Sequence, residues 1–214
     1  MNDQPVQEGS VLLIDKPLEW TSFDVVNKLR RVLQMKKIGH AGTLDPLATG
    51  LLIICTGTKT KAINDFMGLE KEYTGTMVVG QTTPSHDLET EPTEPLTLEG
   101  LAPETLTSLT TRFTGAISQI PPLHSAIKVD GKRAYRFARK GIEKKLEPRQ
   151  VEVSMFELTR IELPEVDFRV VCSKGTYIRS LVRDFGEACG KGAYLSALRR
   201  TRIGPYRVED ARKL

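Results

Sequence analysis

The order of hydrophobic and polar residues along the chain predicts short strands alternating with helices. Apolar and β-branched runs bounded by turn residues are typical of strands, and they occur at residues 10–15, 51–55, 72–79, 166–173 and 203–208. Apolar residues spaced three and four apart predict helices, and this spacing occurs at residues 21–33, 132–140, 177–189 and 193–200. The chain has no internal repeats, so the pattern indicates one mixed structure of strands and helices.

One stretch interrupts both periods: residues 39–50 read GHAGTLDPLATG. Its glycines allow tight turns, and Pro46 pushes Asp45 toward an extended conformation. The buried strand predicted at 51–55 follows directly, so Asp45 is expected on a rigid loop that leans on the core. A rigid loop of this kind is a suitable position for a nucleophile or a general base. An aspartate that hydrogen-bonds its own backbone in a turn is the alternative, and this stretch leaves both open.

Three other local signals bear on the organisation of the chain. Thr21 and Asp24 have the spacing of a capping box at the start of a helix. Pro103 has the position expected at the start of another, shorter helix. Residues 81–101 are rich in Thr, Glu and Pro, which predicts an exposed loop that faces solvent and binds no anion. Residues 57–61 lack the spacing of a phosphate-binding loop, so nucleoside triphosphate binding is excluded.

Composition is that of a soluble globular protein. The 214 residues are 39% hydrophobic and 27% charged, which is ordinary for a folded domain. The three cysteines, Cys55, Cys172 and Cys189, form no CxxC pair, which indicates reduced thiols and argues against disulfides and a zinc site. No apolar run is long enough for a signal peptide or a membrane span. We therefore expect a cytoplasmic protein with no membrane partner.

Positive charge is concentrated in one segment. The net charge of the chain is only +4. Between residues 124 and 149, however, three acidic residues face nine basic ones: Lys128, Lys132, Arg133, Arg136, Arg139, Lys140, Lys144, Lys145 and Arg149. On the helix predicted at 132–140, Arg133, Arg136 and Lys140 form a stripe opposite an apolar face. A concentrated basic segment suggests a polyanionic partner, and a solvated charged helix is the alternative.

The inventory of reactive side chains narrows the possible chemistry. The three histidines, His40, His86 and His124, form no metal-binding motif, and no serine-nucleophile motif is present. An aspartate can act as a covalent nucleophile without a cofactor or metal. Arg179 lies at the start of a predicted helix, where a cation is disfavoured, so it needs a carboxylate partner or is an ordinary surface arginine. Tyr73, in the strand predicted at 72–79, fits a core, edge or site position.

Several motifs in order along the chain resemble the bacterial-type tRNA pseudouridine-55 synthase family. The resemblance covers residues 12–208, and the stretch at 39–50 is its most specific part. The matching segments also include DKP at 15–17 with TS at 21–22, KEY at 71–73, QIPP at 119–122 with SAIK at 125–128, CSKGTYIR at 172–179 and LRRT at 198–201.

The resemblance implies an α+β pseudouridine synthase fold: a mixed, mostly antiparallel sheet flanked by helices, in one catalytic domain over residues 1–214. Asp45 would be the nucleophile that isomerises a uridine in the T-loop of tRNA. Tyr73 would pack on the flipped base and is a candidate for proton transfer, Arg179 would pair with Asp45, and His40 would take the place that the base vacates. The insertion at about 120–150 would clasp the T-arm. The candidate RNA-binding residues are His40, Lys16, Lys128, Lys132, Arg133, Arg136, Arg139, Lys140, Leu198 and Arg199.

This chain also departs from the family pattern. The Asp-rich segment expected after Tyr73 reads TTPSHDLE at 82–89, where Asp87 alone is retained, and His124 replaces a usual Tyr. The chain is expected to be a short form without the C-terminal RNA-binding domain of many members, and a monomer. Two other functions stay open: a non-catalytic tRNA-binding or RNA-folding protein, and a glycosidase or nucleoside hydrolase, for which no motif supplies the second carboxylate. The point at which Asp45 attacks, uracil or ribose, also stays open.

Overall fold

The structure is a computed structural model that describes residues 9–125, 127–129, 131–134, 137, 140–142, 144 and 146–214. The chain forms two compact units. Unit 1 consists of the chain up to Thr74 together with residues 198–214, and unit 2 consists of residues 75–197. Strands β4 (Lys71–Val79) and β10 (Ala193–Ile203) contribute residues to both units. The single catalytic domain expected from the sequence stays a prediction.

Unit 1 is built around β3 (Ala48–Thr56). One edge of β3 pairs antiparallel with β1 (Val11–Lys16), and the other edge pairs first with β10, in parallel, and then with β2 (Ile38–Ala41), antiparallel. β12 (Arg212–Lys213) runs parallel to β1, and β11 (Tyr206–Arg207) forms a hairpin with β10. Leu51 to Cys55 of β3 are each 0% exposed, which confirms the buried strand predicted there.

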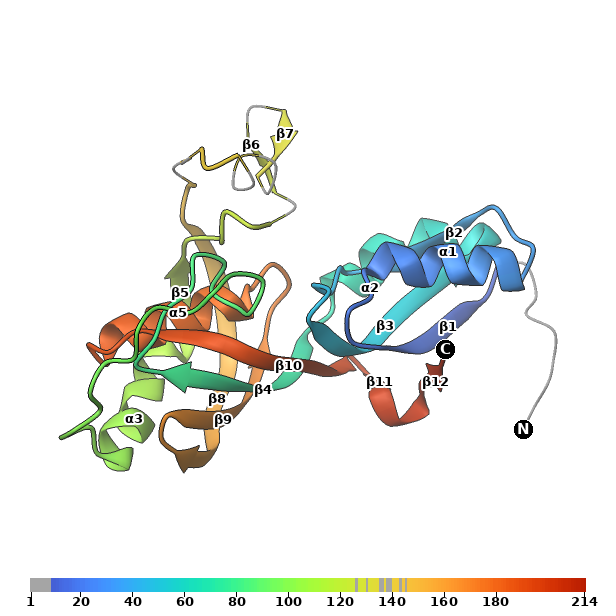
Figure 1. Cartoon of the computed structure of the whole chain (residues 1–214). Helices are drawn as coiled ribbons and strands as arrows, with labels where there is room; N and C mark the ends of the chain where they lie inside the picture. The colour runs from blue at the N-terminus through green and yellow to red at the C-terminus, as the bar shows by residue number, and fades with distance from the viewer. Residues whose placement is uncertain are drawn as a thin grey trace. The chain divides into compact units, whose positions relative to one another are not determined.

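Two hydrophobic clusters cover the two faces of β3. Figure 1 shows helix α1 (Ser22–Val32) lying along β1 and β3. The helix begins with the predicted capping box, because Thr21 and Asp24 exchange side-chain-to-backbone hydrogen bonds of 2.9 and 3.0 Å. Its Val25, Val26 and Leu29 join Leu52 and Ile54 in one cluster. The alternate residues of β3 join Ile203 and Val208 in the other cluster. Burial on both faces explains why this strand has no alternating polar positions.

Short helical segments complete unit 1. The 3₁₀ helix η1 (Gly57–Ala62) and helix α2 (Ile63–Gly68) follow β3, and the 3₁₀ helix η3 (Val208–Asp210) precedes β12. The ring of Phe66 in α2 meets the edge of the Tyr206 ring in β11, with 5.8 Å between centroids. This contact fixes the C-terminal hairpin onto the unit.

Unit 2 contains strands in the order β10-β4-β9-β8-β5, with β5 (Gly115–Gln119), β8 (Arg149–Glu162) and β9 (Glu165–Cys172) paired antiparallel. Helix α3 (Pro103–Leu109) leads into the 3₁₀ helix η2 (Thr110–Phe113), and helix α5 (Ile178–Ala188) follows β9. Phe185 of α5 packs against Phe156 of β8 at 5.6 Å and Phe113 of η2 at 5.9 Å. The mixed, mostly antiparallel sheet with flanking helices confirms the predicted α+β class.

The C-terminal segment corrects two predictions. Residues 193–200, predicted as a helix, belong to strand β10, whose Leu198 to Arg200 pair with Ala48 to Gly50 of β3. The Ala- and Leu-rich sequence favours a helix locally, but pairing with a buried strand overrides that preference. The strand predicted at 203–208 is in fact the end of β10, a turn with Gly204 at φ +52°, and β11.

The basic segment corrects a third prediction. The helix predicted at 132–140 does not begin at Lys132, because Lys132–Arg133 forms strand β7, which pairs with β6 (Lys128–Val129). Gly131, at φ +76°, lies in the predicted turn between them. Phe137 itself is helical, and its N–H donates to the carbonyl of Ala134. Arg136 and Arg139 lie outside the described residues.

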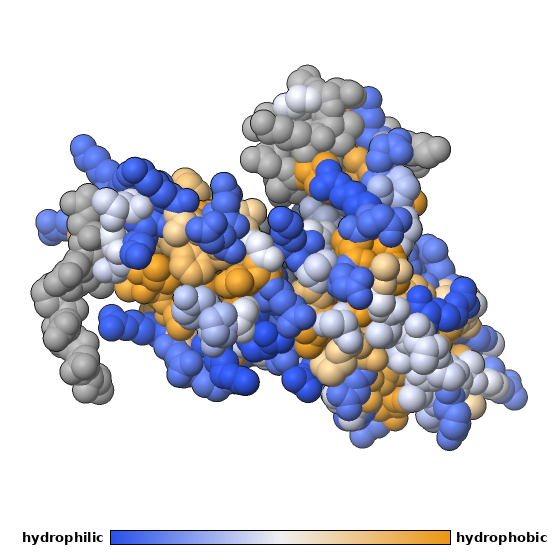
Figure 2. Space-filling view, turned by 180° about the vertical axis from the view of Figure 1, so that it is seen from behind, coloured by the Kyte–Doolittle hydropathy of each residue, from blue (hydrophilic) through white to orange (hydrophobic). Residues whose placement is uncertain are grey.

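The surface shown in Figure 2 mixes hydrophilic residues with smaller hydrophobic patches on both units. The most exposed large apolar side chains include Leu18, Phe23 and Val32 of unit 1. In the part of the chain that the structure describes, no helix is both long and apolar enough to cross a bilayer.

Candidate active site

Asp45 lies in the loop between β2, which ends at Ala41, and β3, which begins at Ala48. The two strands pair from Ile38↔Thr56 to Ala41↔Ile53, so the loop closes a hairpin. Gly42 has φ +88° and Gly50 has φ +103°, conformations that side chains disfavour. Gly42 therefore makes the turn after β2, whereas Gly39 and Gly50, which the sequence also suggests as turn residues, lie within strands β2 and β3.

Hydrogen bonds from other elements hold the residues on both sides of Asp45. The Ser22 hydroxyl, at the start of α1, accepts from the Leu44 N–H at 2.8 Å and donates to the Leu44 carbonyl at 3.2 Å. The Pro46 carbonyl accepts from the Glu19 N–H at 2.8 Å. Asp45 itself is half-buried, and its carbonyl accepts from the Ala48 N–H at 3.1 Å. The backbone around the carboxylate is thus fixed before any substrate binds.

Lys16, a predicted RNA-binding residue, has a buried side chain. Its ammonium donates to the carbonyl oxygens of Pro17, Trp20 and Pro46, the last at 3.3 Å. Burial lowers the pKa of Lys16 to about 8, and the negative charge of Asp45 opposes this shift. The lysine remains mostly protonated at neutral pH. Its position in the structure supports the Asp45 loop from within, and direct contact with RNA stays a prediction.

Arg200 is a second buried cation in unit 1, and sequence reasoning did not single it out. Its side chain is 1% exposed. The guanidinium donates to the Leu51 carbonyl at 2.7 Å through Nε and to the Gly42 carbonyl at 3.1 Å. It therefore bridges the two ends of the Asp45 loop. The adjacent Arg199 is half-buried and makes a bidentate ion pair with Asp15 at 2.8 and 3.0 Å, and Leu198 is half-buried beside it.

Replacing Gly50 with alanine is expected to destabilise unit 1. A Cβ at this position would lie 2.3 Å from the Arg200 carbonyl oxygen, and the residue has φ +103°. We expect a loss of about 2 kcal/mol or more in the free energy of unfolding, measured by urea titration. Gly68→Ala is the matched control, since no atom lies within 4 Å of its added Cβ. Equal stability of the two variants would contradict the tight packing of β3 against β10.

The other two candidates of unit 1 lie on neighbouring strands. Tyr73 is in β4 and is 9% exposed. His40 is in β2 and is half-buried. Burial, followed by the positive charge of Arg200, lowers the pKa of His40, and contact with the Gly42 backbone opposes this shift. The imidazole is therefore neutral at physiological pH.

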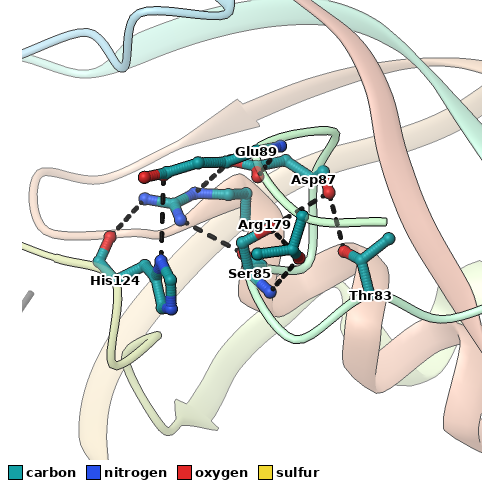
Figure 3. A network of polar contacts seen from close by, with 7 residues as sticks. Thr83, Ser85, Asp87, Glu89, His124 and Arg179 are labelled. Atoms are coloured by element: carbon teal, nitrogen blue, oxygen red, sulfur yellow. Dashed lines mark hydrogen bonds and ion pairs between the residues drawn. The ribbon is translucent and has the colours of Figure 1, made fainter. Parts of the chain in front are cut away.

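Arg179 lies in unit 2, at the second residue of α5, and is 3% exposed (Figure 3). Its guanidinium donates to the Ser85 carbonyl at 3.2 Å and to the His124 carbonyl at 2.9 Å. Its Nε lies 3.4 Å from Oδ2 of Asp87. Asp87 thus supplies the carboxylate that a cation at a helix start was expected to need. The predicted pairing of Arg179 with Asp45 stays a prediction.

The loop that contains Asp87 is more ordered than the sequence suggests. Residues 81–101 were predicted to be exposed, but Thr83, Ser85 and Asp87 are buried. The hydroxyls of Thr83 and Ser85 both donate to the Asp87 carbonyl, at 2.7 and 3.0 Å, and Oδ1 of Asp87 accepts from the Glu89 N–H at 2.9 Å. These bonds turn the loop inward, so it holds Asp87 against Arg179 (Figure 3).

Two histidines border this network. Glu89 approaches Nδ1 of His124 at 3.8 Å. Burial and then the charges of Arg183 and Arg179 lower the pKa of His86 to about 4, so His86 is neutral. The sequence signal that could have found this site is Asp87 itself, the retained acid of a substituted motif.

The candidate residues of the basic segment are only partly described. Lys140 is exposed, and Lys128, Lys132 and Arg133 lie on the β6–β7 hairpin. Within the described ranges, no group of three or more His, Cys, Asp and Glu side chains is placed to hold a metal ion.

Comparison with known proteins identifies the family. Residues 30–178 match the model of the TruB family pseudouridylate synthase N-terminal domain. The chain belongs to the TruB family of pseudouridylate synthases. Residues 179–214, which carry α5 and β10, match the tRNA pseudouridylate synthase B C-terminal domain.

TruB-family relatives resemble the chain over nearly its whole length. The tRNA pseudouridine synthase B of Flavobacterium johnsoniae is 54% identical over 99% of this chain and 95% of its own. The tRNA pseudouridine synthase B of Opitutus terrae is 48% identical over 97% of this chain and 87% of its own length. This TruB-family chain is therefore an enzyme of the pseudouridine synthase class.

Solved structures show the same fold. The chain matches a protein of a Cbf5–Nop10–Gar1 complex with a TM-score of 0.77, 32% identity, and coverage of 98% of this chain and 53% of that one. It matches an H/ACA RNP bound to a substrate RNA containing 2′-deoxyuridine with a TM-score of 0.70, 29% identity, and coverage of 96% and 50%. The chain thus spans about half the length of these proteins. The pseudouridine synthase fold predicted from the sequence is confirmed.

Proposed function

We propose that this enzyme isomerises a uridine in the T-loop of tRNA to pseudouridine, with Asp45 as the nucleophile. The observation that carries the proposal is the fixed backbone around Asp45. Leu44 is held by Ser22, and Pro46 is held by Glu19 and Lys16. In a member of a pseudouridylate synthase family, a half-buried carboxylate on a loop with a fixed backbone is better explained as a nucleophile than as an aspartate that only forms a turn.

The reaction requires the uridine to leave its stack. Extruding a base costs a few kcal/mol, and His40 would offset part of this by occupying the vacated place. Asp45 then attacks the uracil ring or the ribose C1′, and the bond between C1′ and N1 breaks. The base turns and C1′ bonds to C5, the bond to Asp45 breaks and releases the carboxylate, the proton on C5 is lost, and N1 gains a proton. The atoms balance without a cofactor or metal.

Charges near Asp45 suit this role. Lys16 and Asp45 attract each other. The protonated lysine therefore favours the ionised carboxylate, which is the form that can act as a nucleophile. One of the three carbonyls that accept from the Lys16 ammonium, that of Pro46, belongs to the backbone of the Asp45 loop. Tyr73, buried on β4, would pack against the flipped base, and Arg179 would complete the site by pairing with Asp45.

The proposed substrate follows from the relatives and from the charge of the chain. The relatives are named tRNA pseudouridine synthases, and one solved neighbour is bound to a substrate RNA. The nine basic residues between 124 and 149 would contact the phosphates of the T-arm. We expect the enzyme to act as a monomer in the cytoplasm.

The direct test is to incubate the protein with an unmodified T-arm stem-loop and map pseudouridine by chemical labelling and mass spectrometry. Pseudouridine at one T-loop uridine is the expected result. Tight binding without product would favour the non-catalytic tRNA-binding protein. Release of free uracil would favour a nucleoside hydrolase. Product in other RNAs but not in the T-arm would refute the proposed substrate.

The basic segment is expected to set the salt dependence of tRNA binding. Replacing Arg133, Arg136 and Lys140 together with glutamine should weaken binding and reduce the slope of log K against log salt by about two to three, because each phosphate contact releases counterions. Filter binding between 50 and 200 mM salt measures the slope. An equal loss of slope on replacing Lys36, Lys59 and Lys61, three charged side chains on the surface of unit 1, would contradict a specific role for the segment.

A further inference from the structure

Arg200 occupies a place where a charge is unfavourable. Its side chain is 1% exposed, and its strand position is opposite Gly50 of β3. Among the described residues its hydrogen-bond acceptors are two neutral carbonyls, of Leu51 and Gly42, and no carboxylate pairs with it. Burying a guanidinium costs several kcal/mol, and hydrophobic residues of similar size often replace buried charges without loss of stability. Stability alone therefore does not account for an arginine here.

The two bonds of Arg200 reach both ends of the loop that carries the proposed flipping and catalytic residues. The Gly42 carbonyl lies two residues after His40, and the Leu51 carbonyl lies six residues after Asp45. The NH1 group lies 3.5 Å from where a Cβ of Gly42 would be, so the guanidinium packs directly on that turn. One planar group with fixed donors thus ties the turn after His40 to the strand after Asp45.

We propose that Arg200 is a positioning residue for base flipping, which fixes the turn after His40 and places a permanent positive charge beside the imidazole. The inference rests on the proposed function, in which His40 takes the place of the flipped base. Arg200 itself need not touch RNA, because its side chain is buried.

The positive charge of Arg200 matters because RNA shifts the pKa of His40 in the opposite direction. A polyanion raises the pKa of a nearby histidine and so favours the imidazolium. A cation inside a base stack loses its hydration, whereas the neutral ring stacks like a base. The charge of Arg200 acts in the opposite sense to RNA, since it lowers the pKa of His40. The other charged groups on elements packed against β2 are Asp24, Lys28, Arg30 and Arg31 on α1, Asp65 on α2, and Lys59 and Lys61 on η1.

Two substitutions separate the two contributions of Arg200. Arg200→Met removes both the hydrogen bonds to the Leu51 and Gly42 carbonyls and the positive charge. Arg200→Lys keeps a positive charge but loses the planar guanidinium that donates to two carbonyls at once. Arg202→Met is the matched control on the same strand, because Arg202 pairs with Glu70 at 2.8 Å and lies outside the loop. Each full-length variant is checked for folding by thermal unfolding, and the imidazole of His40 is titrated by NMR, assigned with a His40→Gln variant.

The expected results follow from geometry and charge. Both Arg200 variants should lower the single-turnover rate of pseudouridine formation about 10- to 100-fold, with tRNA affinity nearly unchanged. In Arg200→Met the pKa of His40 should rise toward the ordinary value of histidine. Because the neutral ring is the active form, this variant should lose further activity as the pH falls through the raised pKa, whereas the parent and Arg200→Lys should not.

Several outcomes would overturn the inference. An unchanged pKa of His40 in Arg200→Met would refute the role of the charge. A rate of pseudouridine formation equal to that of the parent in Arg200→Lys would refute the role of the planar guanidinium. If Arg200→Met does not fold, Arg200→Lys still decides the geometric part, and the parent titration with and without T-arm RNA decides the electrostatic part. If the parent forms no pseudouridine, the proposed function fails first. The His40 titration then still reports whether Arg200 controls its charge.

Discussion

Asp45→Asn is expected to abolish pseudouridine formation while leaving tRNA binding almost intact. The substitution is isosteric, so the bonds of Leu44 and Pro46 that hold the loop should remain. An amide is not a nucleophile, however, and loss of a nucleophile typically lowers the rate by at least about 10⁴-fold. Single-turnover rates with a T-arm stem-loop and equilibrium binding of the same RNA measure the two quantities.

The matched control for this prediction is Asp65→Asn. Asp65 is an exposed aspartate in α2 of the same unit, so it tests the loss of one negative charge from unit 1. We expect its rate and affinity to equal those of the parent. Turnover by Asp45→Asn at the parental rate would exclude Asp45 as the nucleophile. A loss of binding that parallels the loss of rate would instead assign Asp45 to RNA recognition.

Asp87→Asn is expected to be the most damaging single change in unit 2. Asp87 and Arg179 have side chains 8% and 4% exposed, and the carboxylate lies 3.4 Å from the guanidinium. Removing one member of a buried ion pair typically costs 3–5 kcal/mol. We expect about 3 kcal/mol, at the lower end, because the carbonyls of Ser85 and His124 still accept from Arg179. Urea unfolding measures this loss.

The same variant should also lower the rate of isomerisation, if Arg179 pairs with Asp45 as proposed. Asp184→Asn provides the control in the same helix, because Asp184 pairs with Arg183 at 2.7 Å and is 26% exposed. Partly exposed pairs contribute about 0–1 kcal/mol, so this control should remain close to the parent in stability and rate. Similar losses in both variants would show that the Asp87 pair has no special importance.

The elements that were predicted correctly are those whose sequence signal is local. The capping box of α1 lies within four residues, and the buried strand β3 is an unbroken apolar run. The helix after Tyr177 repeats apolar residues at helical spacing, and the structure places α5 there. In each case neighbouring residues alone determine the conformation, so the pattern is visible without knowledge of contacts.

The elements that were missed depend on distant partners. Strand β10 looks helical in its own sequence and becomes a strand by pairing with β3, about 150 residues away. Strand β7 was predicted as the start of a helix because Arg133 fits a basic stripe with Arg136 and Lys140, whereas a turn at Gly131 pairs it with β6. Long-range pairing leaves no local period to detect.

The candidate site shows the same limit. Asp45, His40 and Tyr73 were selected through motifs, and the structure gives each a defined place in unit 1. Arg200 and Asp87 were not selected as site residues. Nothing local marks a buried arginine, and Asp87 was noted only as the retained acid of a substituted motif, with no sign in the sequence that its loop turns inward. Their importance comes from the carbonyls and charges that meet them in the folded chain.

The anchors of the Asp45 loop contact its backbone. Ser22 binds the amide and carbonyl of Leu44, Lys16 binds the carbonyl of Pro46, and Arg200 binds the carbonyl of Gly42. Backbone groups are the same whatever side chain a residue carries, and the side chain of Thr43 is exposed. Thr43 could therefore change during evolution without loosening the carboxylate. The backbone anchors fix the position of Asp45, while an exposed side chain such as that of Thr43 is free to change to suit a different RNA.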